Sequence, residues 1–172
     1  MTPLLEIFGF LSVVLRGAIL AFQSLVIGGL VFYLVSARLP DFRDAQQGIR
    51  RFVRWFALSL AVTEALFILA NTAILMQSAE MPLAEAAGAN YFVVGLITVT
   101  AALLICALTR RESLPTVPIL LLMVVIIACR VATSHAASRI DNRLVLAGLT
   151  GLHQAATAAW IGGLPFLLIS LR

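Results

Sequence analysis

Residues 144–170 read LVLAGLTGLHQAATAAWIGGLPFLLIS, a run of 27 residues without Asp, Glu, Lys or Arg. An α-helix needs about 20 mostly apolar residues to cross the hydrocarbon core of a bilayer. The run therefore predicts a membrane-spanning helix. It also contains His153, one of only two histidines in the chain. An ionisable side chain inside the membrane is a candidate functional group, because burying it there costs free energy.

Four further stretches of low charge precede this run. Of the 172 residues, 62% are hydrophobic and 12% are charged, and the mean hydropathy of +1.06 lies far above that of soluble domains. We therefore predict an all-α integral membrane protein that forms a single transmembrane helical domain over residues 1–172. Its five transmembrane helices are expected at approximately 10–37, 55–77, 90–109, 115–134 and 144–170.

The distribution of arginine predicts which ends of these helices face the cytoplasm. All 12 basic residues are arginines, and cytoplasmic loops retain such residues. The second connection, residues 77–90, contains Glu80 and Glu85 but no arginine, whereas Arg139 and Arg143 in the fourth connection oppose the trend. We predict that the N-terminus lies outside and the C-terminus in the cytoplasm. The arginines of the two predicted cytoplasmic connections are Arg38, Arg43, Arg50, Arg51 and Arg54 in the first, and Arg110 and Arg111 in the third.

Two similar segments, one in the first helix and one in the last, indicate an internal repeat. Residues 27–32 read IGGLVF and residues 161–166 read IGGLPF. Parallel repeats occur in transporters, so a second copy of the fold could begin at the fifth helix. Paired glycines also allow two helices to pack closely, which is the alternative explanation. The sequence leaves both open.

The two histidines are the leading candidate metal ligands. His153 lies about 11 residues into its helix, or about 16 Å along the axis. His135 precedes the turn by a few residues and is expected to lie several ångström closer to the surface. Imidazole binds copper, zinc and iron, and sulfur ligands favour Cu(I). Cys129, Met76 and Met81 are the weaker candidate ligands; as an alternative, the histidines serve only as core or solvated side chains.

Four polar residues fall inside the first two predicted helices. Arg16 and Glu64 are charged, and Gln23 and Asn71 each follow one of them by seven residues, on roughly the same helix face. A lone charge in the bilayer costs at least a few kcal/mol unless it is paired or neutralised. We expect these residues to pair, to line a hydrated path, or to hold the bundle together by hydrogen bonds.

The last 40 residues of the chain resemble the signature of the copper resistance protein D (CopD) family. The similarity rests on Ser134-His135-Ala136-Ala137, followed by His153, Trp160 and Gly162-Gly163-Leu164. The rest of the chain is similar more loosely, and the whole resembles the N-terminal five-helix portion of the family. The resemblance implies a protein of the bacterial inner membrane that accepts copper from the periplasmic side, with His135 and His153 as ligands. It also implies a periplasmic copper carrier of the CopC type as a partner, and a homo-oligomer would complete a permeation path.

Two alternatives stay open beside copper handling. Two histidines on different helices suffice to bind one haem b, which would indicate an electron-transfer protein. A structural or assembly subunit without a cofactor is the other. No nucleophile–base pair or HExxH-like set appears, so we expect no enzymatic activity. We also expect no nucleic-acid binding, because the arginines cluster in connections without interleaved aromatic residues.

Overall fold

The computed structural model describes residues 2–36, 43–111, 113–134 and 141–170. Within these ranges the regular elements are the α-helices α1 (Thr2–Ser36), α2 (Arg43–Ser78), α3 (Leu83–Ala87), α4 (Asn90–Leu108), α5 (Thr116–Ala132) and α6 (Arg143–Ser170). Helices α1, α2, α4 and α6 are long and apolar enough to cross a membrane, and α5 is an apolar helix of 17 residues. The prediction of an all-helical membrane bundle is confirmed. Its sidedness and the crossing by α5 stay predictions.

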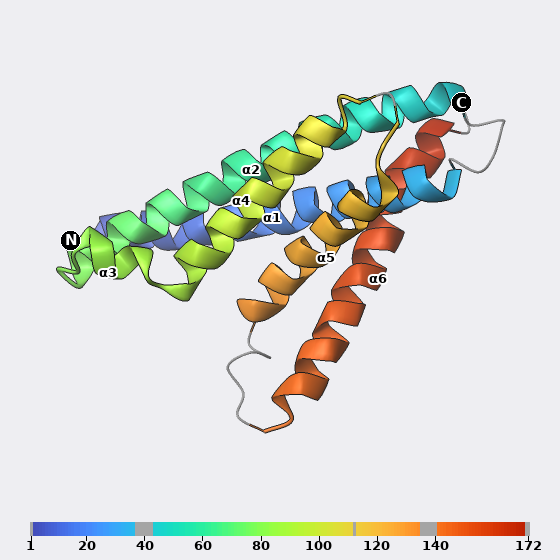
Figure 1. The fold of residues 1–172 in the computed structure, drawn as a ribbon. Coiled ribbons are helices and arrows are strands. Elements are labelled where there is room, and N and C mark those ends of the chain that lie inside the picture. Colours follow the sequence, from blue (N-terminus) through green and yellow to red (C-terminus); the bar gives the residue numbers. More distant parts are fainter. Residues whose placement is uncertain (1, 37–42, 112, 135–140, 171–172) are drawn as a thin grey trace.

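The long helices form two groups that separate toward one end of the molecule. Figure 1 shows α1, α2 and α4 running lengthwise together, while α5 and α6 diverge from them toward the bottom of the view. The C-terminal half of α6 crosses α1, and α1 also packs along α2. The molecule is therefore closed at the end where α1 leads into α2, and wedge-shaped at the other.

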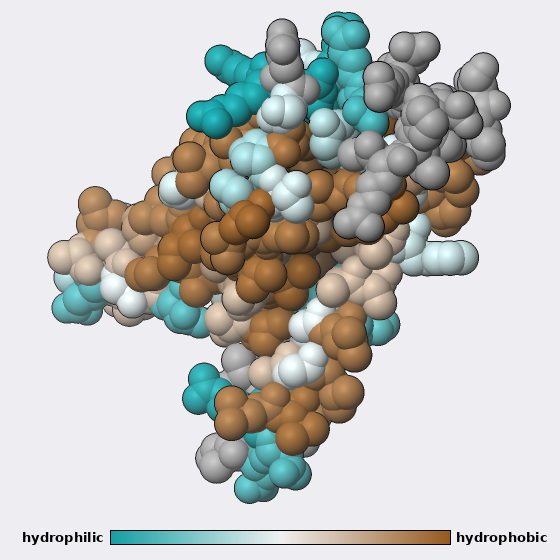
Figure 2. All heavy atoms as spheres, turned by 45° about the vertical axis from the view of Figure 1, so that its right-hand side comes forward, coloured by the Kyte–Doolittle hydropathy of each residue, from teal (hydrophilic) through white to brown (hydrophobic). Residues whose placement is uncertain are grey.

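The surface is apolar over most of its area. In Figure 2 hydrophobic side chains form a broad band on the visible face, and hydrophilic ones gather at the top and at the lower and left-hand tips. Single residues agree with this picture, since Leu144 is 88% exposed and Phe10 74% exposed. Such a distribution fits a surface that contacts lipid acyl chains rather than water.

Helix α2 begins at Arg43, twelve residues before the predicted start at residue 55. The prediction was wrong because hydropathy marks the apolar span and not the helix. Arg, Gln and Ala are strong helix formers, so the charged segment continues the helix beyond the membrane core. Arg43, Arg50, Arg51 and Arg54 therefore lie on α2 rather than in a connection. The short helix α3, which starts after Pro82, was also not predicted.

The two glycine pairs of the similar segments meet where α1 and α6 cross. A Cβ atom on Gly28 would overlap the backbone of Gly162 and Gly163, and one on Gly162 would overlap the backbone carbonyl of Ser24. Only glycine allows the two backbones to approach this closely. Close backbone packing is thus an observed role of Gly28 and Gly162, one from each pair, while the internal repeat stays a prediction.

Phe166 fills the space beside this crossing. Its side chain is fully buried against Gly29, and its ring meets Phe56 edge to face with 6.3 Å between the centroids. This aromatic contact packs α6 against α2 beside Gly29 of α1.

We expect Phe166→Ala to destabilise the fold by about 3 kcal/mol or more, because it removes a fully buried ring. Trp160→Ala is the matched control, since Trp160 lies on the same helix but is 73% exposed. Thermal unfolding of the detergent-purified variants measures both. Equal losses in the two variants would contradict the packing role of Phe166.

Candidate functional site

A polar cavity of about 380 Å³ lies where the two groups of helices separate. It receives residues from α1, α2, α4, α5 and α6, although α5 and α6 diverge from the other helices. Its apolar lining is Leu20, Phe67 and Val94, and its polar lining is Arg16, Glu64, Asn90, Tyr91, Thr98, Cys129, Arg130, Thr133, Ser134 and Gln154. Because Asn90 begins α4 and Thr133 follows the end of α5, the cavity reaches the predicted outer end of the bundle.

Glu64 is the buried carboxyl group of this polar cavity. Its side chain is 5% exposed, and its Oε2 atom has no hydrogen-bond partner in the structure. The other carboxyl oxygen faces Gly95 of α4, where a Cβ atom would lie 3.3 Å from it. A small residue at position 95 therefore makes room for the carboxyl group beside α4. A buried carboxyl group without a partner is costly, so its position calls for a functional explanation.

Two arginines share the polar cavity with Glu64. Arg130 and Glu64 attract each other through space, and Arg130 and Arg16 repel each other. The Arg16 guanidinium lies over the ring of Phe67, 5.3 Å from its centroid, which is a cation–π contact. Within the described residues Arg16 and Glu64 form no ion pair. Both line the polar cavity, which agrees better with the expectation of a shared hydrated path than with the expectation of a pair.

Cys129 contributes a thiol group to the polar cavity. Both cysteines are buried free thiols, but Cys129 lines this cavity and Cys106 does not. Ser134, the residue before His135, lines the same cavity, while His135 itself lies outside the described residues.

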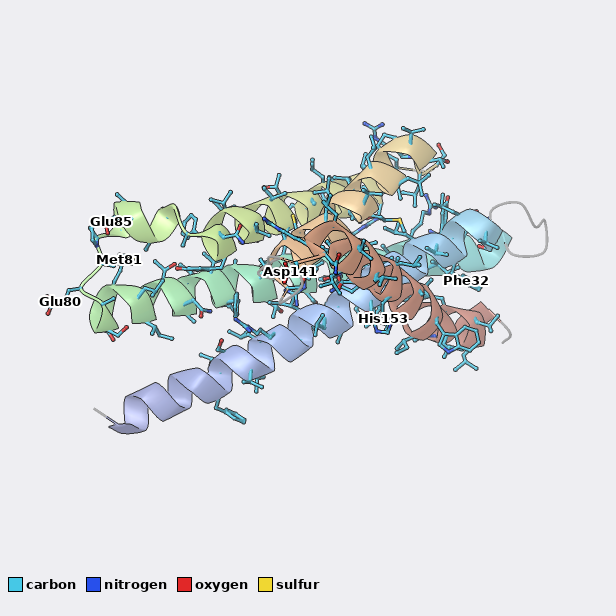
Figure 3. All side chains as sticks on the ribbon, turned by 90° about the horizontal axis from the view of Figure 1, so that it is seen from below. Phe32, Glu80, Met81, Glu85, Asp141 and His153 are labelled. Carbon is cyan, nitrogen blue, oxygen red and sulfur yellow. The ribbon has the colours of Figure 1, made fainter. Side chains whose placement is uncertain are left out.

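His153 lines a second, adjoining pocket of about 280 Å³ between α1 and α6. Gln23, Ser24 and Thr157 belong to this histidine pocket, and Leu20 and Gln154 line both it and the polar cavity. Figure 3 places His153 on α6 where that helix passes α1. The two pockets thus adjoin each other at the junction of α1 with α6, where they share Leu20 and Gln154.

Three of the sequence candidates lie away from both pockets. The side-chain amide of Asn71 donates to the backbone oxygen of Phe67, 2.8 Å away, within its own helix. Met76 is 43% exposed near the end of α2, and Met81 lies in the connection from α2 to α3 (Figure 3). Among the described residues no group of three or more His, Cys, Asp and Glu side chains is arranged to hold a metal ion.

Comparison with known proteins leaves the chain without an assigned relative. Neither protein-family models, nor curated proteins, nor solved structures match it.

Sequence reasoning did not single out Gln154 or assign Arg130 to the polar cavity. Gln154 follows His153 directly, and its Oε1 atom is buried without a hydrogen-bond partner. Arg130 lines the cavity together with Glu64. The sequence signal for each of the two residues was only a polar side chain near a candidate ligand. Together with Glu64 they give the two pockets hydrogen-bond acceptors, donors and charge.

Proposed function

We propose that this membrane protein admits copper, as cargo, to the polar cavity from the outer side of the bundle. One observation carries the proposal: the cavity brings the buried carboxyl group of Glu64, whose Oε2 atom has no hydrogen-bond partner, and the thiol of Cys129 into one space inside an apolar bundle. Polar side chains in the membrane interior usually have a function, because burying them costs free energy. Since the cavity reaches the start of α4, a cargo could reach Glu64 and Cys129 from the outer end of the bundle.

The chemistry of the ligands favours copper among small cargoes. A cysteine sulfur prefers Cu(I), and imidazole and carboxylate groups add ligands that copper accepts. His153 in the adjoining pocket is a ligand on the side of α1, and the resemblance to the CopD family rests on His153 as well. His135, one residue beyond Ser134, is proposed as the ligand nearest the outer end. A CopC-type carrier is proposed as the donor of copper, in the bacterial inner membrane.

We expect Cys129→Ala and His153→Ala each to lower the affinity of the purified protein for Cu(I) by about tenfold or more, since each removes one proposed ligand. Competition against a chromophoric Cu(I) chelator measures this. Cys106→Ala is the matched control, because it removes another buried thiol that lies outside both pockets. The proposal fails if all three variants bind copper as the wild type does.

The arginines of the polar cavity favour a second candidate, a small anionic or zwitterionic solute. Arg16 and Arg130 could bind its acidic group, since guanidinium groups pair with carboxylates and phosphates. The variant Arg130→Gln separates the two candidates when Cu(I) and a small carboxylate are both offered as probes. For a copper site, the wild type binds Cu(I) and the variant binds it more tightly, because a repelling charge is lost. For an anion site, the wild type binds the carboxylate and the variant binds it more weakly.

A further inference from the structure

A basic pocket of about 390 Å³ lies at the opposite end of the bundle from the mouth of the polar cavity. It is formed by the first turns of α2 and by the segment that follows α4. Among the described residues that line it, four are arginines and one, Trp55, is aromatic. The described lining is Gln47, Arg50, Arg51, Arg54, Trp55, Thr109 and Arg110.

Two of the arginines are held in place by the end of α4. Arg54 donates from Nη2 to the backbone oxygen of Thr109 at 2.8 Å, and Arg50 donates from Nη1 to the backbone oxygen of Arg111. The Nε atom of Arg54 is shielded from solvent and has no hydrogen-bond partner. Arg51, by contrast, is exposed. The guanidinium groups of Arg50 and Arg54 are therefore already oriented, and a ligand would not have to order these two.

The length of α2 places this basic pocket at the level of lipid headgroups. Twenty-four residue steps separate Arg54 from Ser78 at the other end of the helix, which is about 36 Å. The hydrocarbon core is about 30 Å thick, so the arginines fall just beyond it. Trp55 is 57% exposed, and tryptophan side chains concentrate at the membrane interface.

We propose that the basic pocket binds the phosphate group of an anionic phospholipid. Clustered arginines match phosphate oxygens in charge and hydrogen-bonding geometry, and basic pockets between transmembrane helices bind acidic headgroups. The exposed Trp55 on one wall provides an apolar surface for the adjoining glycerol and acyl region. This ligand is independent of the cargo proposed for the polar cavity.

The test uses the full chain in nanodiscs of phosphatidylcholine with added phosphatidylglycerol or cardiolipin, followed by native mass spectrometry of the lipid that stays bound. Arg51→Gln removes the charge of an exposed side chain. Arg54→Gln removes the charge of a side chain that is hydrogen-bonded to the backbone oxygen of Thr109. We expect each to lower the retained anionic lipid by about tenfold, the effect of one charge-assisted hydrogen bond. Arg143→Gln, an exposed arginine at the start of α6, is the control and retains the wild-type amount.

A second arm distinguishes a lipid from soluble phosphate. Millimolar inorganic phosphate is added to the protein with its anionic lipid bound, and the same phosphate is offered to the protein in pure phosphatidylcholine. Retention of the lipid against phosphate, together with its loss in both pocket variants, supports the proposal. Displacement by phosphate, or equal lipid retention in Arg51→Gln, Arg54→Gln and Arg143→Gln, overturns it. Circular dichroism of each variant verifies that the helices are intact.

Discussion

Gly162→Leu is expected to abolish the packing of α6 against α1, so that the protein no longer elutes as a folded species from size exclusion. A Cβ atom at Gly162 falls on the backbone carbonyl of Ser24, and backbone cannot move aside as a flexible side chain can. The smaller change Gly162→Ala is expected to cost about 3 kcal/mol, the upper part of the range for overpacked sites. Thermal unfolding in detergent, monitored by the folded peak, measures both.

Gly148 provides the matched control for Gly162. It lies on the same helix, and a Cβ atom there meets no atom within 4 Å. Replacing glycine by alanine in a helix normally stabilises it by about 1 kcal/mol, so Gly148→Ala is expected to be neutral or slightly stabilising. Identical unfolding of Gly162→Ala and Gly148→Ala would show that the α1–α6 crossing is not as close as described.

Gly28→Ala tests the crossing from the side of α1. Its Cβ atom would meet the backbone of Gly162 and Gly163, so it forces the same two helices apart. Once one substitution has separated α1 from α6, the second meets little further overlap. The double variant with both Gly28→Ala and Gly162→Ala is therefore expected to lose less stability than the sum of the losses in the two single variants. Gly17→Ala, in open space on α1, is the corresponding control.

The membrane helices could be predicted because their signal is local. A run such as residues 144–170 is apolar over the full thickness of a bilayer, and length and composition alone make it a helix. The start of α2 was missed for the same reason. Charges between Arg43 and Arg54 lower the hydropathy, although nothing there breaks a helix. Hydropathy thus located the spans well and the ends of the helices poorly.

The polar cavity could be predicted only in its components. Glu64 and Arg16 stood out as charges in apolar runs, but their meeting with Cys129 and Gln154 depends on how α5 and α6 diverge from the other helices. That divergence follows from the crossing of α1 with α6 at Gly28 and Gly162, and a sequence pattern specifies no crossing angle. The same geometry determined that His153 adjoins the cavity, whereas Met76 and Met81 lie apart from it.

Glu64→Leu is expected to lower the affinity for Cu(I) without a large loss of thermal stability. The wild-type carboxyl group is buried with one unpartnered oxygen, so an apolar side chain of similar size removes a desolvation cost, but it also removes the attraction between Glu64 and Arg130. We expect these two effects to offset each other to within about 1 kcal/mol. Among the described residues that line the polar cavity, Glu64 is the only acidic one, so the affinity for Cu(I) is expected to fall by about tenfold or more. Chelator competition and thermal unfolding are measured on the same preparation.

Glu64→Gln and Asn71→Leu distinguish a functional carboxyl group from a structural one. Glu64→Gln keeps the shape of the side chain but loses its charge, so it should lose copper affinity without loss of stability. Asn71→Leu removes another polar group from α2, outside both pockets, and should leave copper affinity unchanged. If Glu64→Leu instead unfolds at a lower temperature and binds copper normally, Glu64 serves the packing of α2 on α4. If Glu64 instead contributes binding and little stability, its retention in the bundle is explained by the cargo, because selection for stability alone does not require a buried carboxyl group.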